Sequence, residues 1–439
     1  MRLYSVRFKP QYIVGYSNVI YNFIQKCKIF EQNNHKLIGF HEKPGRVLTV
    51  NENRRMQQIA LGVGFVWFTS QFGGGFASGT QLYQYFINFG IWCLITPAIA
   101  QLFQAFFQWY ALRFAYDNKT ANYREFCDLF YGRTKFVFSN LYEAVYLMLI
   151  LLAPSIAFAT GGSTLHELTG IPYILCTVIV GVFIFGVSLM DTDMIRKAAT
   201  VVSYILIIGI LCVFIPNIIV QWGSITDAIS QMLSGTLPVG STESGSFGSA
   251  LWYCILYGAY HVASIGLYVQ HAQKFTDRKQ CLTSMVYGFI INTVVITLVA
   301  VGLLAVAMNP ELPNYSVYTL LFAQCGVASG ILAPVVSLLI ILGSVFSGVN
   351  MITGFVNRVV TGLEKKEDSR TAAGKRKKRT IITALLCTLA TFSIAQFGLL
   401  PLVKKGYSYL GFACIVVIVV PFLVRMFLEL TGRVKNKVR

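Results

Sequence analysis

A glycine-rich run interrupts the first long apolar segment of this chain. It reads Gln71-Phe72-Gly73-Gly74-Gly75-Phe76-Ala77-Ser78-Gly79, and helix-compatible sequence resumes at Thr80. Each glycine inside a helix costs about 1 kcal/mol relative to alanine, and glycine tolerates positive φ, so the backbone is predicted to open here. Close helix packing through small residues is the alternative, but three consecutive glycines do not share one helix face. Opened backbone at membrane depth must line protein or a water-filled cavity.

Composition indicates that the bilayer is the solvent of this chain. Of its 439 residues, 55% are apolar and 12% are charged, which is unlike an ordinary soluble domain. A spanning helix needs ~20 mainly apolar residues. Such runs are found at 57–86, 88–114, 136–160, 171–190, 198–221, 248–273, 281–308, 328–357, 380–398 and 407–428. We therefore expect an all-α integral membrane protein with about ten transmembrane helices.

The basic residues predict how the chain is oriented. If residues 1–56 are cytoplasmic, all of the 36 lysine and arginine residues except Lys404 and Lys405 fall in cytoplasmic segments. Both termini are then expected in the cytoplasm, and the protein in the cell membrane. Orientation explains the net charge of +18, including the run Lys375–Arg379, better than nucleic acid or lipid headgroups do. No nucleic-acid partner is predicted, and no protein partner can be inferred.

The sequence divides into three parts. Residues 1–56 contain no spanning stretch and no signal-peptide pattern, so they are interpreted as a cytoplasmic extension or, because Met56 directly precedes the first span, as a start-site artefact. Residues 57–430 form the predicted membrane transporter domain, and 431–439 a basic cytoplasmic tail. Within the domain, Ser224–Phe247 is rich in serine, glycine and threonine and is expected to be a flexible extracellular connection.

The sixth predicted span carries a second interruption, which runs from Tyr257 through Tyr260 and His261 to Ser264. It lies five spans after the first, and an odd number of spans inverts a second copy, so a 5+5 inverted repeat is predicted. Paired interrupted segments in two halves indicate a transporter's binding site. The half-helix after Gly79 presents N–H groups to a substrate carboxylate. Opened carbonyls near Gln71 and Phe72 are expected to coordinate a cation such as Na⁺.

The run Gly73–Gly79 closely resembles the GAGFASG signature of the YkvI-like membrane proteins, which belong to the amino acid, polyamine and organocation transporter superfamily. The resemblance spans roughly residues 57–430. It implies the LeuT-type inverted repeat with broken first and sixth helices, and it bears on the fold more than on the substrate. By analogy with LeuT-type sodium symporters, Ser344 and Ser347 in the eighth span are expected to face the first break at a sodium site. Hydrogen bonding between helices explains them equally well.

Other polar residues lie inside the predicted spans. Glu143 is a candidate proton-coupling residue, because an intramembrane carboxylate is costly, and its alternative is an interfacial carboxylate paired with a basic residue. His261 is expected either to contact substrate or to be structural, and the superfamily more often has a small or amide residue there. Tyr257 and Tyr260 are candidates for a pocket wall or for packing. A stripe at i, i+3 and i+7 in the second span must face other helices: Gln101, Gln104 and Gln108.

No ATP-binding Gly-x-x-x-x-Gly-Lys-Ser/Thr motif and no HExxH or GxSxG motif is found in the sequence. The leading hypothesis is therefore a secondary active transporter that couples Na⁺ or H⁺ to an amino acid or related small organic solute by alternating access, with no other cofactor. A membrane receptor of transporter fold is the alternative. An intramembrane enzyme is the third reading, and its acid-base groups would be Glu143, His261, Asp191 and Asp193.

Overall fold

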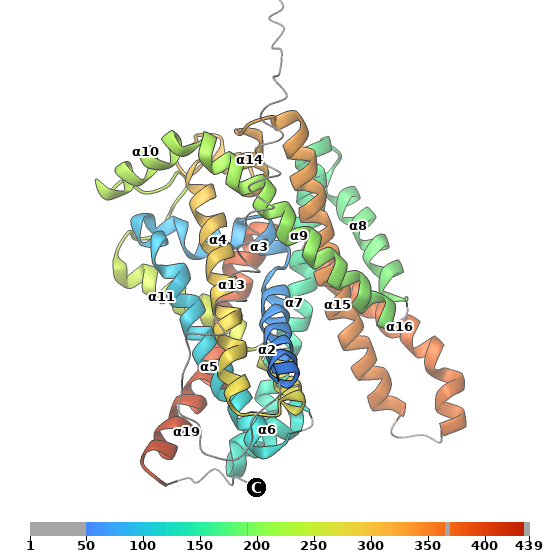
Figure 1. Cartoon of the computed structure of the whole chain (residues 1–439). Coiled ribbons are helices and arrows are strands. Elements are labelled where there is room, and N and C mark those ends of the chain that lie inside the picture. Colours follow the sequence, from blue (N-terminus) through green and yellow to red (C-terminus); the bar gives the residue numbers. More distant parts are fainter. Residues whose placement is uncertain (1–49, 121, 191, 365–368, 434–439) are drawn as a thin grey trace, which may run out of the picture. The chain divides into compact units, whose positions relative to one another are not determined.

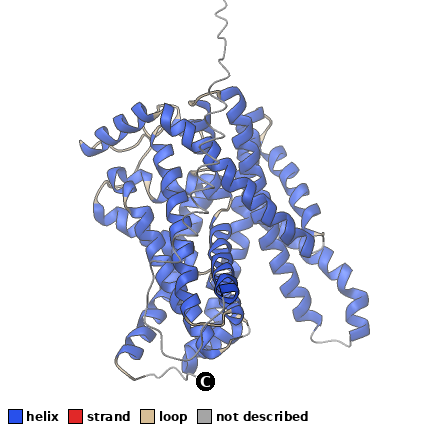
Figure 2. Ribbon diagram, viewed as in Figure 1, coloured by secondary structure: helices blue, strands red, loops and turns tan. Residues whose placement is uncertain are grey.

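The computed structural model describes residues 50–120, 122–190, 192–364 and 369–433, and within them the regular elements are helices without a strand (Figures 1 and 2). The membrane domain lies within Arg54–Arg439. The predicted extension lies outside the described residues except for 50–56. The predicted tail lies outside them except for 431–433.

Helices long and apolar enough to cross a membrane dominate the described residues. Six pass this test singly, and two bent pairs raise the number to eight. The shorter apolar helix α8 and the interrupted segment α2–α4 complete about ten passes. In chain order the passes are α2, α3 and α4 (Val50–Gln71, Gly74–Ala77, Thr80–Tyr85), α5 (Thr96–Asn118), α7 (Lys135–Thr169), α8 (Tyr173–Ser188), α9 (Thr192–Val220), α11 and α12 (Phe247–Val262, Ile265–Tyr268), α13 (Lys279–Leu304), α15 (Ser329–Glu364), α16 (Ser369–Ala395), and α17, α18 and α19 (Leu399–Pro401, Tyr407–Cys414, Val420–Leu430).

The two halves repeat one plan. Each has a broken pass, an unbroken pass, a short helix and then a long pass. The short helices are α6 (Tyr123–Tyr131) between α5 and α7, and α14 (Tyr318–Gln324) between α13 and α15. Equivalent passes pack on one another, α5 on α13 and α7 on α15. Because five passes separate equivalent elements, the second copy is inverted, and the predicted architecture is confirmed.

Apolar side chains cover the outside of this domain. Ile208 on α9, Ile290 on α13 and Leu338 on α15 are each more than half exposed, and similar residues follow them along the same helices. A soluble monomer rarely exposes apolar patches of this extent. The bilayer is the solvent that accepts them, so the chain is a multi-pass membrane protein.

One predicted loop contains a helix. The segment Ser224–Phe247 is not a flexible connection throughout, because α10 (Trp222–Leu233) occupies its first part and bends away from α9 by 74°. Ile225, Ala228 and Met232 are buried along one side of α10. These apolar side chains, spaced three and four residues apart, anchor the helix to the domain. The serine and glycine content of the segment hides this spacing in the sequence.

Candidate functional site at the two helix breaks

The first break opens where the glycine run begins. Helix α2 ends at Gln71, and the Gly73 amide then bonds to the Gln71 carbonyl at 2.8 Å in a tight turn. One helical turn, α3, follows before Gly79, whose φ of +75° favours glycine. A side chain on Gly79 would also meet Leu303 at 2.9 Å. The sequence therefore breaks the helix twice within nine residues, before and after α3.

Hydroxyl groups gather around the glycines of this break. A Cβ atom on Gly73 would lie 3.1 Å from Ser347 Oγ, and one on Gly74 would lie 3.0 Å from Ser344 Oγ and 2.7 Å from Thr160 Oγ1. Thr160 comes from α7, is fully buried, and its hydroxyl has no hydrogen-bond partner in the described chain. The structure thus places Ser344 and Ser347 beside the break, and the sodium site expected of them stays a prediction. Thr160 was missed, since nothing local sets it apart.

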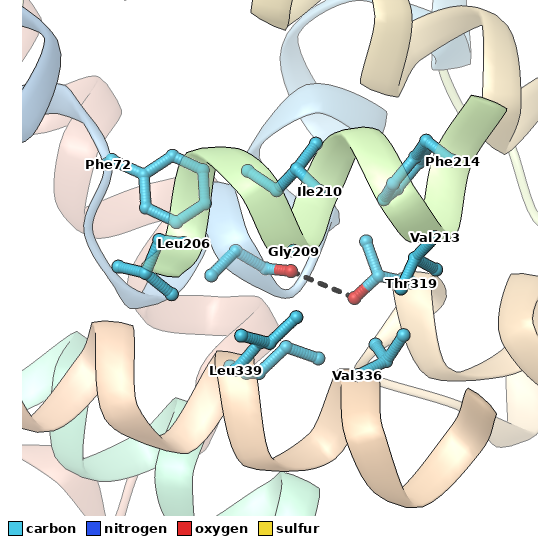
Figure 3. A pocket seen from close by; sticks show the side chains of 11 residues that line it. Phe72, Leu206, Gly209, Ile210, Val213, Phe214, Thr319, Val336 and Leu339 are labelled. Atoms are coloured by element: carbon cyan, nitrogen blue, oxygen red, sulfur yellow. Dashed lines mark hydrogen bonds between the residues drawn. The ribbon is translucent and has the colours of Figure 1, made fainter. Parts of the chain in front are cut away.

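The other end of α3 is covered by α14. The Thr319 amide donates to the Ser78 carbonyl at 3.0 Å, and the Thr319 hydroxyl donates to the Ala77 carbonyl at 2.9 Å, which is the dashed line in Figure 3. Beside these bonds lies an apolar pocket, enclosed by α9, α15 and Phe72 (Figure 3). Carbonyls at this end of the break are therefore satisfied by protein.

The second break is narrower than its predicted interval. Helix α11 stays regular through Val262, and the chain opens only at Ala263 and Ser264 before α12 begins. Gly258 lies within the helix, and its lack of a side chain makes room for Phe103. A Cβ atom on Gly258 would lie 2.6 Å from a carbon of the Phe103 ring. The Tyr142 hydroxyl from α7 spans the opening. It donates to the Ala263 carbonyl at 3.0 Å and accepts from the Gly266 amide at 2.9 Å.

Gln81 joins the two broken passes. Its side chain is 2% exposed and reaches from α4 to α11, where the amide nitrogen hydrogen bonds to the Tyr260 hydroxyl and lies 3.2 Å from His261 Nε2. The Tyr260 ring stacks on Tyr407 at 4.4 Å, and the buried Tyr257 hydroxyl has no partner in the described chain. The three residues predicted in the sixth span thus lie together and meet the first break through Gln81, which the sequence analysis missed.

Buried amides surround the end of α2. The Gln71 side chain donates to Gln104 and accepts from Gln101 at 3.1 Å, and Trp67 also donates to Gln104 at 3.4 Å. All four side chains are buried. Gln101 and Gln104 of the α5 stripe therefore face the last turn before the break and fix the Gln71 side chain there, whereas the buried Gln108 side chain has no partner in the described chain.

Glu143 belongs to a separate cluster. Its carboxylate is ion-paired with Arg358 of α15 and accepts from the Tyr123 hydroxyl at 2.5 Å. Arg358 lies over the Tyr123 ring, 4.5 Å from its centroid. These partners come from α6 and α15 and not from either break. The ion pair of the second interpretation is thus present, and proton coupling by Glu143 stays a prediction.

Two solved proteins with the same fold are membrane transporters. The manganese transporter of Eremococcus coleocola superposes with a TM-score of 0.51 at 17% identity, over 88% of this chain and 82% of that chain. A Na⁺-coupled sialic acid symporter superposes with a TM-score of 0.53 at 13% identity, over 77% of this chain and 74% of that chain. No protein-family model and no curated protein matches this sequence. The predicted LeuT-type fold class is confirmed, whereas the YkvI-like family remains a resemblance.

Proposed function

We propose that this chain is a secondary active transporter that moves an amino acid or related small organic solute together with Na⁺ or H⁺ by alternating access. One observation carries the proposal. The opened backbone at Gly73 and Gly74 faces hydroxyls from two other passes, and Gln81 joins this break to its counterpart in the inverted repeat. Paired breaks of this kind mark the binding site of inverted-repeat transporters.

The lining of the breaks favours an organic solute over a divalent cation. Residues 71–85 contain no acidic or basic side chain, and residues 257–270 contain only His261. Manganese and similar ions are held largely by carboxylates and imidazoles. A zwitterion or carboxylate can instead use backbone N–H groups near Gly79 and neutral side chains such as Gln81 and Tyr260. The cargo of the manganese transporter is therefore not proposed for this chain.

The cation is proposed to bind beside the substrate. Ser344, Ser347 and Thr160 supply hydroxyl oxygens at Gly73 and Gly74, beside the point where helix α2 ends. Oxygen ligands of this kind suit a monovalent hard cation such as Na⁺. No protein partner and no cofactor beyond this ion are needed. We place both termini in the cytoplasm, which puts α14 on the extracellular face.

The proposal is tested by thermal unfolding of the full chain in detergent, with amino acids and other small carboxylates in sodium and in potassium salt. A ligand that binds only the folded state raises the melting temperature by mass action. We expect a rise that requires both a solute and sodium. Coupled uptake into vesicles follows for any solute found. Binding without accumulation would contradict transport and favour a receptor of transporter fold, and no rise with any amino acid would contradict that substrate class.

A further inference from the structure

A second carboxylate on α7 lies at the end opposite Glu143. Glu167 Oε1 accepts two hydrogen bonds from Ser316, at 2.9 Å from its amide and 2.6 Å from its hydroxyl. The Val317 amide also faces this carboxylate, but no donor in the described chain lies within hydrogen-bond geometry of the other oxygen, Oε2, which is buried. A buried oxygen without a donor is costly as a carboxylate and favours the arrival of a proton or cation.

Consecutive hydrogen bonds lead from Glu167 to the first break. The Ser316 carbonyl accepts from the Thr80 hydroxyl at 2.5 Å, and the Ser78 hydroxyl donates to Thr80 Oγ1 at 2.9 Å. Three residues after Ser316, Thr319 holds the carbonyls of the same break. The segment that Glu167 anchors is therefore the one that covers the end of α3.

The surroundings of Glu167 and Glu143 differ in charge. Arg358 neutralises Glu143, whereas among the described residues no lysine or arginine forms an ion pair with Glu167. The titratable groups facing Glu167 are His166 on its own helix, and Tyr315 and Tyr318 from the covering segment. None of these is a permanent cation, so the charge of Glu167 depends on protons from the adjoining aqueous phase.

We propose that Glu167 is a further coupling residue, whose protonation from the α14 side of the membrane loosens α14 over the first break. The proton adds to the carboxylate and leaves a neutral carboxylic acid. The two hydrogen bonds from Ser316 then lose the ionised acceptor that makes them strong. Release of Ser316 frees Thr80 and lets Thr319 leave the carbonyls of Ala77 and Ser78. A coupling role for Glu167 rests on the proposed transport function, whereas the loosening of α14 on protonation does not.

Hydrogen–deuterium exchange of the purified full chain tests this claim without any solute. The amides of Ser316 and Thr319 report on Glu167 and on the break respectively. Exchange is measured at two pH values that bracket the titration of a glutamate carboxyl, and is corrected for the intrinsic rate. In the wild type we expect roughly ten-fold faster exchange at the lower pH. Glu167→Gln should exchange fast at both pH values. Glu311→Gln, an exposed carboxylate in the same region, should behave as wild type.

A second variant separates the effect of Glu167 on Ser316 from the effect of Ser316 on Thr319. Thr80→Val removes the hydroxyl that contacts Ser316, so the Ser316 amide should keep its pH dependence while the Thr319 amide becomes fast at both pH values. The proposal is overturned if the wild type shows no pH dependence at either amide, or if Glu167→Gln retains it. Failure here leaves the transport proposal intact. Absence of uptake with a positive exchange result would remove transport and keep the conformational switch.

Discussion

The two helix breaks meet the same physical problem with different chemistry. Both open backbone inside a membrane, where an unpaired N–H or C=O group costs several kcal/mol. At the second break one phenol hydroxyl, that of Tyr142, pairs both the Ala263 carbonyl and the Gly266 amide. At the first, glycines lie against the small hydroxyls of Thr160 and Ser344. The Thr160 hydroxyl has no partner in the described chain, whereas the Tyr142 hydroxyl is bonded on both sides, so the first break is suited to a ligand and the second to a fixed joint.

The largest effect is expected at Gly74. In Gly74→Ala the new methyl group would lie 2.7 Å from Thr160 Oγ1 and 2.9 Å from its Cβ atom, which is too close for either to remain in place. Overpacking of this kind costs about 1–3 kcal/mol. Thermal unfolding should show the loss, and the solute- and sodium-dependent rise in melting temperature should disappear.

Gly62→Ala is the matched control, because no atom lies within 4 Å of its would-be Cβ atom. Gly62 is an exposed residue within α2, and alanine there should raise the unfolding free energy by up to about 1 kcal/mol. An equal loss of unfolding free energy in the two variants would show that side chains do not pack closely around the first break. The proposed difference between the two breaks would then be wrong.

A loss of stability in the same range, but without loss of the ligand response, is expected at the second break. Tyr142→Phe removes one hydroxyl and leaves the Ala263 carbonyl and the Gly266 amide without their shared partner. Buried unpaired groups cost about 1–3 kcal/mol, so the melting temperature should fall while ligand-dependent stabilisation persists. Tyr204→Phe, at an exposed position on α9, serves as control and should change little. Loss of ligand response in Tyr142→Phe alone would make the second break part of the binding site.

The ion pair between Glu143 and Arg358 has a different expected signature. Glu143→Gln removes the charge that pairs with Arg358, both side chains being about a quarter exposed, and should cost about 1–2 kcal/mol. If the pair is structural, the pH dependence of ligand-induced stabilisation should be unchanged. Glu364→Gln, whose partner Arg376 is 59% exposed, should cost less than about 0.5 kcal/mol. An altered pH dependence in Glu143→Gln would instead support Glu143 as a proton-coupling residue.

The smallest effect on stability is expected at Ser344. Its hydroxyl donates to the Ile340 carbonyl at 2.7 Å, a bond that competes little with the helix, so Ser344→Ala should shift the melting temperature by only about 1 °C without sodium. The sodium-dependent part of the rise should be lost. Ser393→Ala removes the same type of bond on an exposed face of α16 and should keep the sodium response. A sodium response that survives in Ser344→Ala would move the cation elsewhere.

The fold and part of the candidate site could be predicted from local sequence. Apolar runs, the glycine run and the spacing of five spans are properties of short segments, and each was confirmed in the architecture. The position of the second break was predicted less accurately. Gly258 suggests a helix break in the sequence, but in the structure it lies within α11, where its missing side chain leaves room for the Phe103 ring. Gln81, Thr160 and Thr319 were missed for a related reason. Their importance comes from contacts with segments far away in sequence, and no periodic pattern records such contacts.

The amides around Gln71 also bear on how the chain enters the membrane. Among the described helices, α2 is not one of those apolar enough by themselves to cross a membrane. Helix α5 is apolar enough when it is taken together with the short helix that precedes it. Insertion into lipid is governed by the hydropathy of each segment, and a bare glutamine amide opposes it. Because Gln71 is satisfied by Gln101 and Gln104 on α5, the first two passes are expected to leave the translocon as one hairpin. Biogenesis of the domain would then begin with a polar contact, before the binding site exists.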